Sequence, residues 1–114
     1  MKRKNVFIVL PADVPTGPIK GALALANQLV KIVPVSIVFL RKSSGIYDHL
    51  DNGVKIFYLN NQKGIIKKII AYRNILINSS DDKVSISFCF SADLVNIFCF
   101  DIAKTISSVR GNLF

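Results

Sequence analysis

The sequence predicts an α/β fold: a Rossmann-like parallel sheet with helices on both faces. Three observations support this class. Short apolar runs alternate with segments of helical periodicity, in the order β-α-β-β-α-β-α-β. The apolar runs are hydrophobic along their whole length, as in strands covered on both sides. Finally, 114 residues that are 51% hydrophobic and 19% charged suit one compact domain.

The first part of the chain predicts two strands around one helix. Residues 5–10 form a run of β-branched and aromatic residues, and a loop with two prolines and a glycine follows over 11–17. Apolar residues recur at helical spacing over 18–33 and predict a helix, with Pro18 in its first turn and Pro34 directly after its last residue. Residues 35–40 form the second apolar strand.

The second part predicts three strands and two helices. A polar segment over 41–52 precedes the third strand at 54–59. Apolar residues at helical spacing then predict a helix over 65–77, and a second helix follows the fourth strand, with Ser91 as its N-cap. The expected bounds of the last three elements are 84–90 for the strand, 92–100 for the helix and 102–109 for the final strand.

Composition limits the kind of protein. Fifteen basic against seven acidic residues give a net charge of +8. Cys89 and Cys99 lie in apolar surroundings and are expected to be buried free thiols in a reducing cytoplasm, and one histidine with two cysteines makes a Cys/His metal site unexpected. The most apolar stretch, 84–100, contains Asp93, which argues against a membrane-spanning helix.

A ligand is expected at the carboxyl ends of the strands, where parallel sheets of this class bind their substrates. In the predicted order this edge carries residues 11–18, 91–93 and 110–112. Thr16 and Gly17 are the first candidates for ligand contact, because a glycine before a helix lets backbone N–H groups approach an anion. Ser91 and Arg110 are the other candidate substrate-binding residues, and a guanidinium suits phosphate or sugar hydroxyls.

The loop after the first strand and its neighbours carry a resemblance. The run Pro-Ala-Asp-Val-Pro-Thr-Gly-Pro over 11–18, followed by Leu-Ala-x-x-Leu over 25–29, resembles the amino-terminal domain of family 4 glycosyltransferases of the GT-B fold. The stretches 84–94 and 106–110 resemble that family's fourth and fifth strands. Two positions depart from the family pattern: Pro18 replaces the second glycine of its pair, and Lys20 replaces an acidic residue.

This resemblance implies a function. Residues 1–114 would form a single partial domain, the acceptor-side half of an enzyme that transfers a sugar from a nucleotide-sugar to a cell-envelope polysaccharide or lipid-linked acceptor. The donor-binding domain of the family, with its pair of glutamates, would lie outside this chain, which contains no glutamate and would be inactive alone. No catalytic residue is assigned, no cofactor is implied beyond the nucleotide-sugar substrate, and the expected location is the cytoplasm, at the inner face of the membrane.

Each candidate residue also has a purely structural interpretation. Gly17 would then only make the turn, Ser91 would only cap its helix, and Arg110 would be a surface residue near the chain end. Lys20 opposes the helix dipole in a first turn, and it either faces an anionic ligand or is simply solvated. Asp13 lies at the same edge, but nothing in its spacing to Asp93 requires a pair of catalytic carboxylates.

Two other functions remain open. A stand-alone nucleotide-binding module fits the fold class, although the G-x-G-x-x-G pattern is absent and basic rather than acidic residues follow the second strand. The other open function is that of a non-enzymatic basic protein. Its basic residues on or near the helix over 65–77 would contact anionic lipids. Binding of nucleic acid is disfavoured, because the charges are scattered and are not interleaved with aromatic residues. The basic residues concerned are Lys63, Lys67, Lys68 and Arg73.

Overall fold

The computed structural model describes residues 4–12, 17–42, 53–59, 63–79, 82–88, 90–99 and 101–108. Within them the elements follow in the predicted order, so the α/β, Rossmann-like fold class is confirmed. The elements are β1 (Lys4–Ala12), α1 (Gly17–Leu29), β2 (Val35–Arg41), β3 (Lys55–Tyr58), α2 (Ile65–Ile77), β4 (Asp82–Phe88), α3 (Phe90–Ile97) and β5 (Lys104–Ser108).

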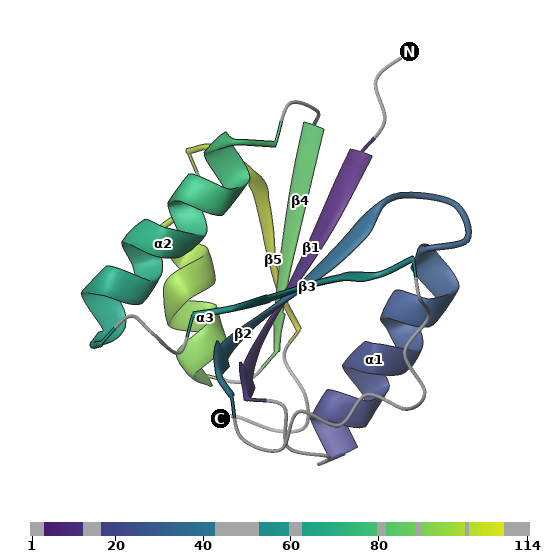
Figure 1. Ribbon diagram of the computed structural model, residues 1–114, viewed down its shortest axis with the longest axis horizontal. Helices are drawn as coiled ribbons and strands as arrows, with labels where there is room; N and C mark the ends of the chain where they lie inside the picture. The colour runs from purple at the N-terminus through teal and green to yellow at the C-terminus, as the bar shows by residue number, and fades with distance from the viewer. Residues whose placement is uncertain are drawn as a thin grey trace.

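The strands form one parallel sheet in the order β3-β2-β1-β4-β5 (Figure 1). β1 lies in the middle, where Val6 pairs with Val35 of β2 on one side and with Val84 of β4 on the other. The outer pairs, β2 with β3 and β4 with β5, are also parallel. Every carboxyl end therefore lies at one edge of the sheet.

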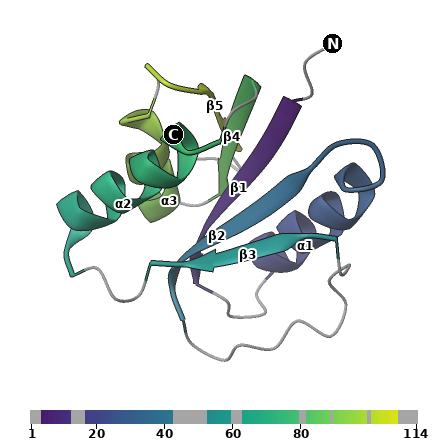
Figure 2. The same cartoon turned by 45° about the horizontal axis from the view of Figure 1, so that its top comes forward.

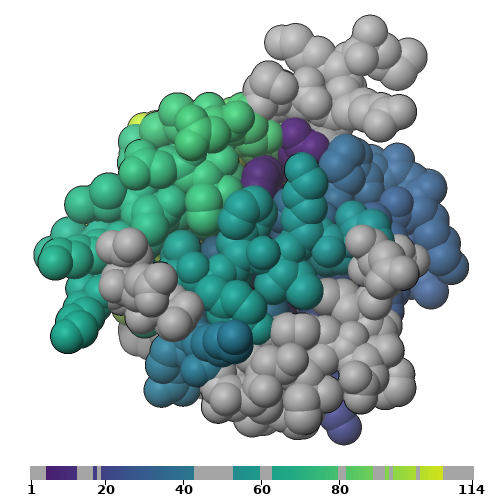
Figure 3. All heavy atoms as spheres, viewed as in Figure 1, coloured from purple at the N-terminus to yellow at the C-terminus, as the bar shows by residue number. Residues whose placement is uncertain are grey.

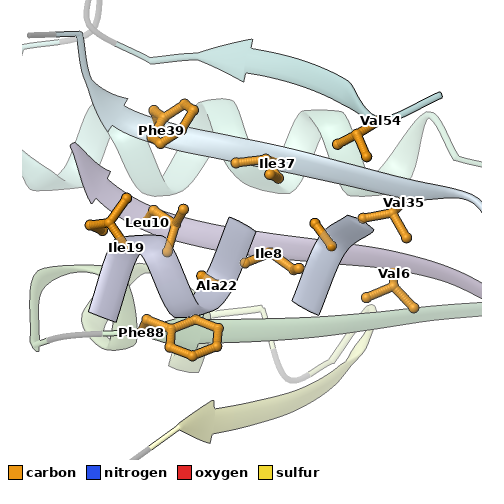
Figure 4. Packing of buried hydrophobic residues seen from close by; sticks show 11 residues of the cluster. Val6, Ile8, Leu10, Ile19, Ala22, Val35, Ile37, Phe39, Val54 and Phe88 are labelled. Carbon is orange, nitrogen blue, oxygen red and sulfur yellow. The ribbon is translucent and has the colours of Figure 1, made fainter. Parts of the chain in front are cut away.

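One face of the sheet is covered by α1. Alternate residues of β1 and β2 point to this face and form a single apolar cluster with the helix (Figure 4). Ala22 and Ala26 are completely buried, and their small side chains let the helix axis approach the strands closely. Phe88, at the end of β4, joins the same cluster.

The opposite face is covered by α2 and α3 (Figure 2). Phe7 and Val9 of β1 pack there against Tyr72 and Leu76 of α2 and against Val95 of α3. Because side chains alternate along a strand, β1 supplies Val6, Ile8 and Leu10 to one cluster and Phe7 and Val9 to the other. The prediction that helices cover both faces is thus correct.

Two boundaries in the first part of the chain were predicted wrongly. β1 continues through Pro11 to Ala12, where a loop was expected. The described pairs of β1 with β4 end at Val9, and β1 then pairs only with β2, so a proline without an N–H group is tolerated at this position. α1 ends at Leu29 instead of residue 33, and in the turn that follows the amide groups of Ile32 and Val33 both donate to the Leu29 carbonyl oxygen.

The bounds of the later elements shift by a few residues. α2 has the predicted bounds, whereas β4 runs over Asp82–Phe88 and α3 begins at Phe90 instead of residue 92. Ser91 is therefore the second residue of α3 and not its N-cap, which corrects that prediction. β5 begins at Lys104, since residues 101–103 form the turn that follows α3.

Cys99 follows α3 and is a buried free thiol, as predicted, whereas Cys89 lies outside the described residues. Burial raises the pKa of the Cys99 thiol to about 11, while the nearby charge of Arg73 lowers it and that of Asp101 raises it again. The fold therefore holds this proton more tightly than the unfolded chain does. The resulting stabilisation is complete below pH 9 and is lost as the pH rises through about 11.

We expect Cys99 to react with iodoacetamide at pH 8 about a hundredfold more slowly in the folded protein than in urea, because only the thiolate attacks the reagent. Mass spectrometry of the peptide that contains Cys99 measures this rate separately from that of Cys89. Equal rates in buffer and in urea would contradict the burial of this thiol.

Candidate functional site

The carboxyl ends of β1 and β4 form the point where the order of strands reverses. From β1 the chain continues through α1 to β2 on one side, and from β4 it continues through α3 to β5 on the other. α1 and α3 cover opposite faces of the sheet (Figure 1), so the two connections diverge above this pair of strands. In open α/β sheets, such a reversal of strand order marks the usual ligand site, beyond the carboxyl ends of the strands.

Gly17 lies near this reversal of strand order as the first residue of α1. Its backbone is exposed, and a Cβ built on it would have no described atom within 4 Å. Packing of the described chain therefore does not require a glycine here. The amide groups of the first turn of α1 have no partners within the helix, and together with the helix dipole they favour an anion.

The other predicted site residues are placed only in part. Thr16 and Arg110 lie outside the described residues, as do Asp13 and His49. Ser91 lies on the first turn of α3, directly beyond β4, so its backbone is at the predicted edge, but its side chain is outside the described part. Lys20 is exposed on α1.

A pocket that the sequence analysis did not identify opens at the carboxyl ends of β1 and β2. It has a volume of about 370 Å³, and both strand ends and the first turn of α2 line it. Its lining residues are Pro11, Leu40, Arg41, Gly64, Ile65 and Lys68. Arg41 is exposed and Lys68 is half-buried, so two cations border the opening.

The start of α2 adds to the positive character of this pocket. Gly64 precedes the helix with φ of 83°, a left-handed conformation that favours glycine, and no side chain caps the helix there. The uncapped amide groups of the first turn therefore present partial positive charge beside Lys68. An anionic group of a ligand would be stabilised in this pocket.

The sequence analysis did not place Arg41 and Lys68 in a ligand site, because it considered only the loops after the first, fourth and fifth strands. β2 and β3 also end at this edge, and a glycine directly before a helical segment at 65–77 was a signal that could have identified the pocket. Lys42 also lies at this edge, but its ammonium group is 5.4 Å from the centroid of the Tyr58 ring, a cation–π contact with β3.

A second hollow of about 320 Å³ lies at the opposite, amino-terminal edge of the sheet. Asn5, Ser36, Lys55 and Asn78 supply its polar lining, and the Asn5 amide donates a hydrogen bond of 2.8 Å to Ser79 Oγ at its rim. Because ligands of open parallel sheets bind at the carboxyl ends, we assign the functional role to the pocket beside Arg41 and to the start of α1 at Gly17.

Metal chemistry and membrane insertion find no support in the described part of the chain. Within it, His, Cys, Asp and Glu side chains do not gather in groups of three or more that could hold a metal ion. The described helices are also too short or too polar to cross a bilayer.

The site thus combines an uncovered helix start at Gly17 with a basic pocket one strand away. Its described charged side chains are Lys20, Arg41, Lys42 and Lys68, and Asp82 and Asp101 lie near the amino ends of β4 and β5. Asp93 belongs to the first turn of α3, but its side chain is outside the described part. This arrangement suits phosphate-bearing or otherwise anionic ligands. Neither a scan against models of protein families nor a search of curated proteins finds a match for this chain.

Proposed function

We propose that this chain is the acceptor-side domain of a glycosyltransferase that uses a nucleotide-sugar donor. The observation that carries the proposal is the reversal of strand order between β1 and β4, with α1 beginning at Gly17 after β1. The resemblance of residues 11–29 to family 4 glycosyltransferases supports it, because that family has a glycine loop and a Leu-Ala-x-x-Leu helix at the same place in the chain.

In the proposed reaction this domain binds and orients the acceptor. The exposed amide groups at the start of α1 hold an anionic or hydroxyl-bearing part of the ligand, and the acceptor hydroxyl is thereby fixed near the donor sugar. Such positioning lowers the barrier by converting an encounter of two molecules into a reaction within one complex. The donor diphosphate would be held by a second domain, as the resemblance implies.

The basic pocket beside Arg41 suggests which acceptors are suitable. An acceptor joined to a lipid through a diphosphate carries two phosphate groups, and Arg41 and Lys68 with the uncapped start of α2 complement that charge. A neutral oligosaccharide has no group that would use these cations. We therefore favour a lipid-linked sugar diphosphate over a free sugar.

One observation favours the alternative of a stand-alone nucleotide-binding module. Arg41 closes β2, the position from which a basic residue can accommodate the 2′-phosphate of a dinucleotide in this fold class. The G-x-G-x-x-G pattern that normally accompanies such binding is absent.

Titration of the full chain separates these functions. We expect a short-chain polyprenyl-diphosphate sugar to bind and to shift the amide signal of Gly17 in a proton–nitrogen correlation spectrum. Gly17→Val should weaken this binding at least tenfold, because its side chain fills the space through which the ligand approaches the amides. Gly21→Ala, at an exposed position one turn further along α1, is the matched control and should leave binding unchanged.

The same titration with UDP, NAD and NADP tests the alternative. Binding of NADP without binding of the lipid-linked sugar would establish the nucleotide-binding module in place of the transferase domain. Absence of binding by every ligand, with a spectrum typical of a folded protein, would refute both.

A further inference from the structure

The outer face of α2 carries isoleucines where a surface helix usually carries polar residues. Ile66, Ile70 and Ile77 are 69%, 53% and 56% exposed, although all three belong to a helix that also buries Tyr72 and Leu76. Their spacing of four and seven residues places them along one side of the helix, away from the sheet. Figure 3 shows the atoms of α2 at the left flank of the molecule.

Two exposed lysines lie at the start of this helix. Lys67 is three residues before Ile70 on α2, and Lys63 lies two residues before the helix begins, so both cations are at the amino-terminal end of the row of isoleucines. We name the set Lys63, Ile66, Lys67, Ile70 and Ile77 the α2 stripe. Both lysines are near the start of α2, where the helix dipole opposes positive charge, so their charge does not serve the stability of the helix.

α3 extends the apolar surface. It lies beside α2 on the same face of the sheet (Figure 1), and Arg73 joins the two by donating a hydrogen bond of 2.8 Å to the Phe98 carbonyl oxygen. The side of α3 away from the sheet exposes Leu94, Ile97 and Phe98 by 37%, 61% and 55%. Ile65, at the start of α2, is 40% exposed as well, so the two helices and the residue after α3 present seven large apolar side chains to the outside.

The charge that α2 contributes to this surface is positive. α2 contains no acidic residue. Asp101, beside α3, is held by Arg73 through contacts of 2.6 Å and 3.0 Å, and this pairing lowers the pKa of its carboxyl group. Arg73 is thus committed to Asp101, and Lys63 and Lys67 supply the free positive charge of the α2 stripe.

We infer that the α2 stripe and the exposed side of α3 rest on an anionic phospholipid surface. Such a surface offers negative headgroups for Lys63 and Lys67 and an acyl boundary for the isoleucines, which is how amphipathic helices lie in the plane of a bilayer. A second copy of the chain fits less well, because α2 has no acidic residue that could pair with the lysines of a partner stripe. The inference rests on this surface alone and is independent of the proposed transferase function.

Sedimentation of the full chain with lipid vesicles tests the inference. In 0.1 M salt we expect binding to vesicles with 30% phosphatidylglycerol and at least tenfold weaker binding to pure phosphatidylcholine. Lys63→Gln with Lys67→Gln should lower the partition coefficient about 25-fold, because each lysine near an anionic surface contributes about fivefold. Lys31→Gln with Lys55→Gln removes two exposed lysines that lie outside α2, α3 and the candidate site, and is the matched control.

The apolar part of the surface has its own pair of variants. Ile66→Gln, Ile70→Gln and Ile77→Gln combined should lower binding at least tenfold and leave the circular dichroism spectrum unchanged, since glutamine is a good helix former at exposed positions. Ile32→Gln is the control, because Ile32 is 77% exposed in the turn between α1 and β2.

Three results would overturn the inference. The first is equal binding to both kinds of vesicle, and the second is binding that the two stripe variants leave unchanged. The third is a concentration-dependent dimer in sedimentation velocity that the isoleucine variants dissociate, with no binding to either vesicle. That result would assign the face to a second copy of the chain.

Discussion

Replacement of Asn96 by Asp is expected to destabilise the protein by about 3–5 kcal/mol at pH 7, which is a large part of the stability of a small domain. Asn96 is 1% exposed, and its Nδ2 group lies 3.1 Å from the Ser85 carbonyl oxygen, 3.0 Å from Ser87 Oγ and 3.1 Å from the Ile106 carbonyl oxygen. The amide thereby ties α3 to β4 and β5. A carboxylate there would replace a donor by a second acceptor and would face two carbonyl oxygens in a buried site.

The pH dependence of this variant identifies the cause. Burial and the lack of donors would raise the pKa of Asp at this position, so the folded form would retain the proton that the unfolded chain releases near pH 4. The variant should therefore approach the stability of Asn96→Leu below pH 4 and fall progressively behind it as the pH rises. Urea denaturation of both variants between pH 4 and 8 measures this difference. A constant difference across that range would show that the new carboxyl group is not buried.

The strands and the fold class could be predicted because the relevant signals are local. An apolar run such as 35–40 must be covered on both sides, and its neighbours in the sequence alone show that it is a strand. The helix over 65–77 was also predicted with its observed bounds, since Gly64 gives it a clear start. The predicted ends of elements were wrong where pairing with a partner strand determines them. Pro11 is tolerated in β1 only because the pairing of β1 with β4 has already ended before it.

The environment of individual side chains depends on residues far apart in the sequence, so it could not be predicted. Ser85 and Ser87 occur in an apolar run and look like interruptions, yet both are fully buried and paired with Tyr72 or Asn96. Helical periodicity likewise cannot tell Ile69, which packs on the core, from Ile70, which is exposed. The pocket beside Arg41 arises only when the starts and ends of three elements meet at one edge of the sheet.

Tyr72→Ala should cost about 3–5 kcal/mol, because it removes a large side chain from the centre of the cluster under α2. Tyr72 is completely buried, and its ring lies edge-on to Phe7 with the centroids 6.5 Å apart. No neighbouring helix can shift into the space without losing its own contacts with the sheet, so a cavity would remain. Urea denaturation monitored by circular dichroism measures the loss, and Ile77→Ala, at an exposed position on the same helix, is the control that should change stability by less than about 1 kcal/mol.

The hydroxyl group of Tyr72 contributes a smaller and separable part. It forms a hydrogen bond with Ser85 Oγ, and burial holds the pKa of Tyr72 well above its usual range, while that bond lowers it in part, so the group stays a neutral phenol. Tyr72→Phe and Ser85→Ala should each cost about 1–2 kcal/mol, because each leaves the other hydroxyl group buried without this partner. The double variant should cost clearly less than the two single losses added together, since neither unpaired group then remains. Strict additivity would show that the two hydroxyl groups contribute to stability independently, and the link from α2 to β4 would then rest on apolar packing alone.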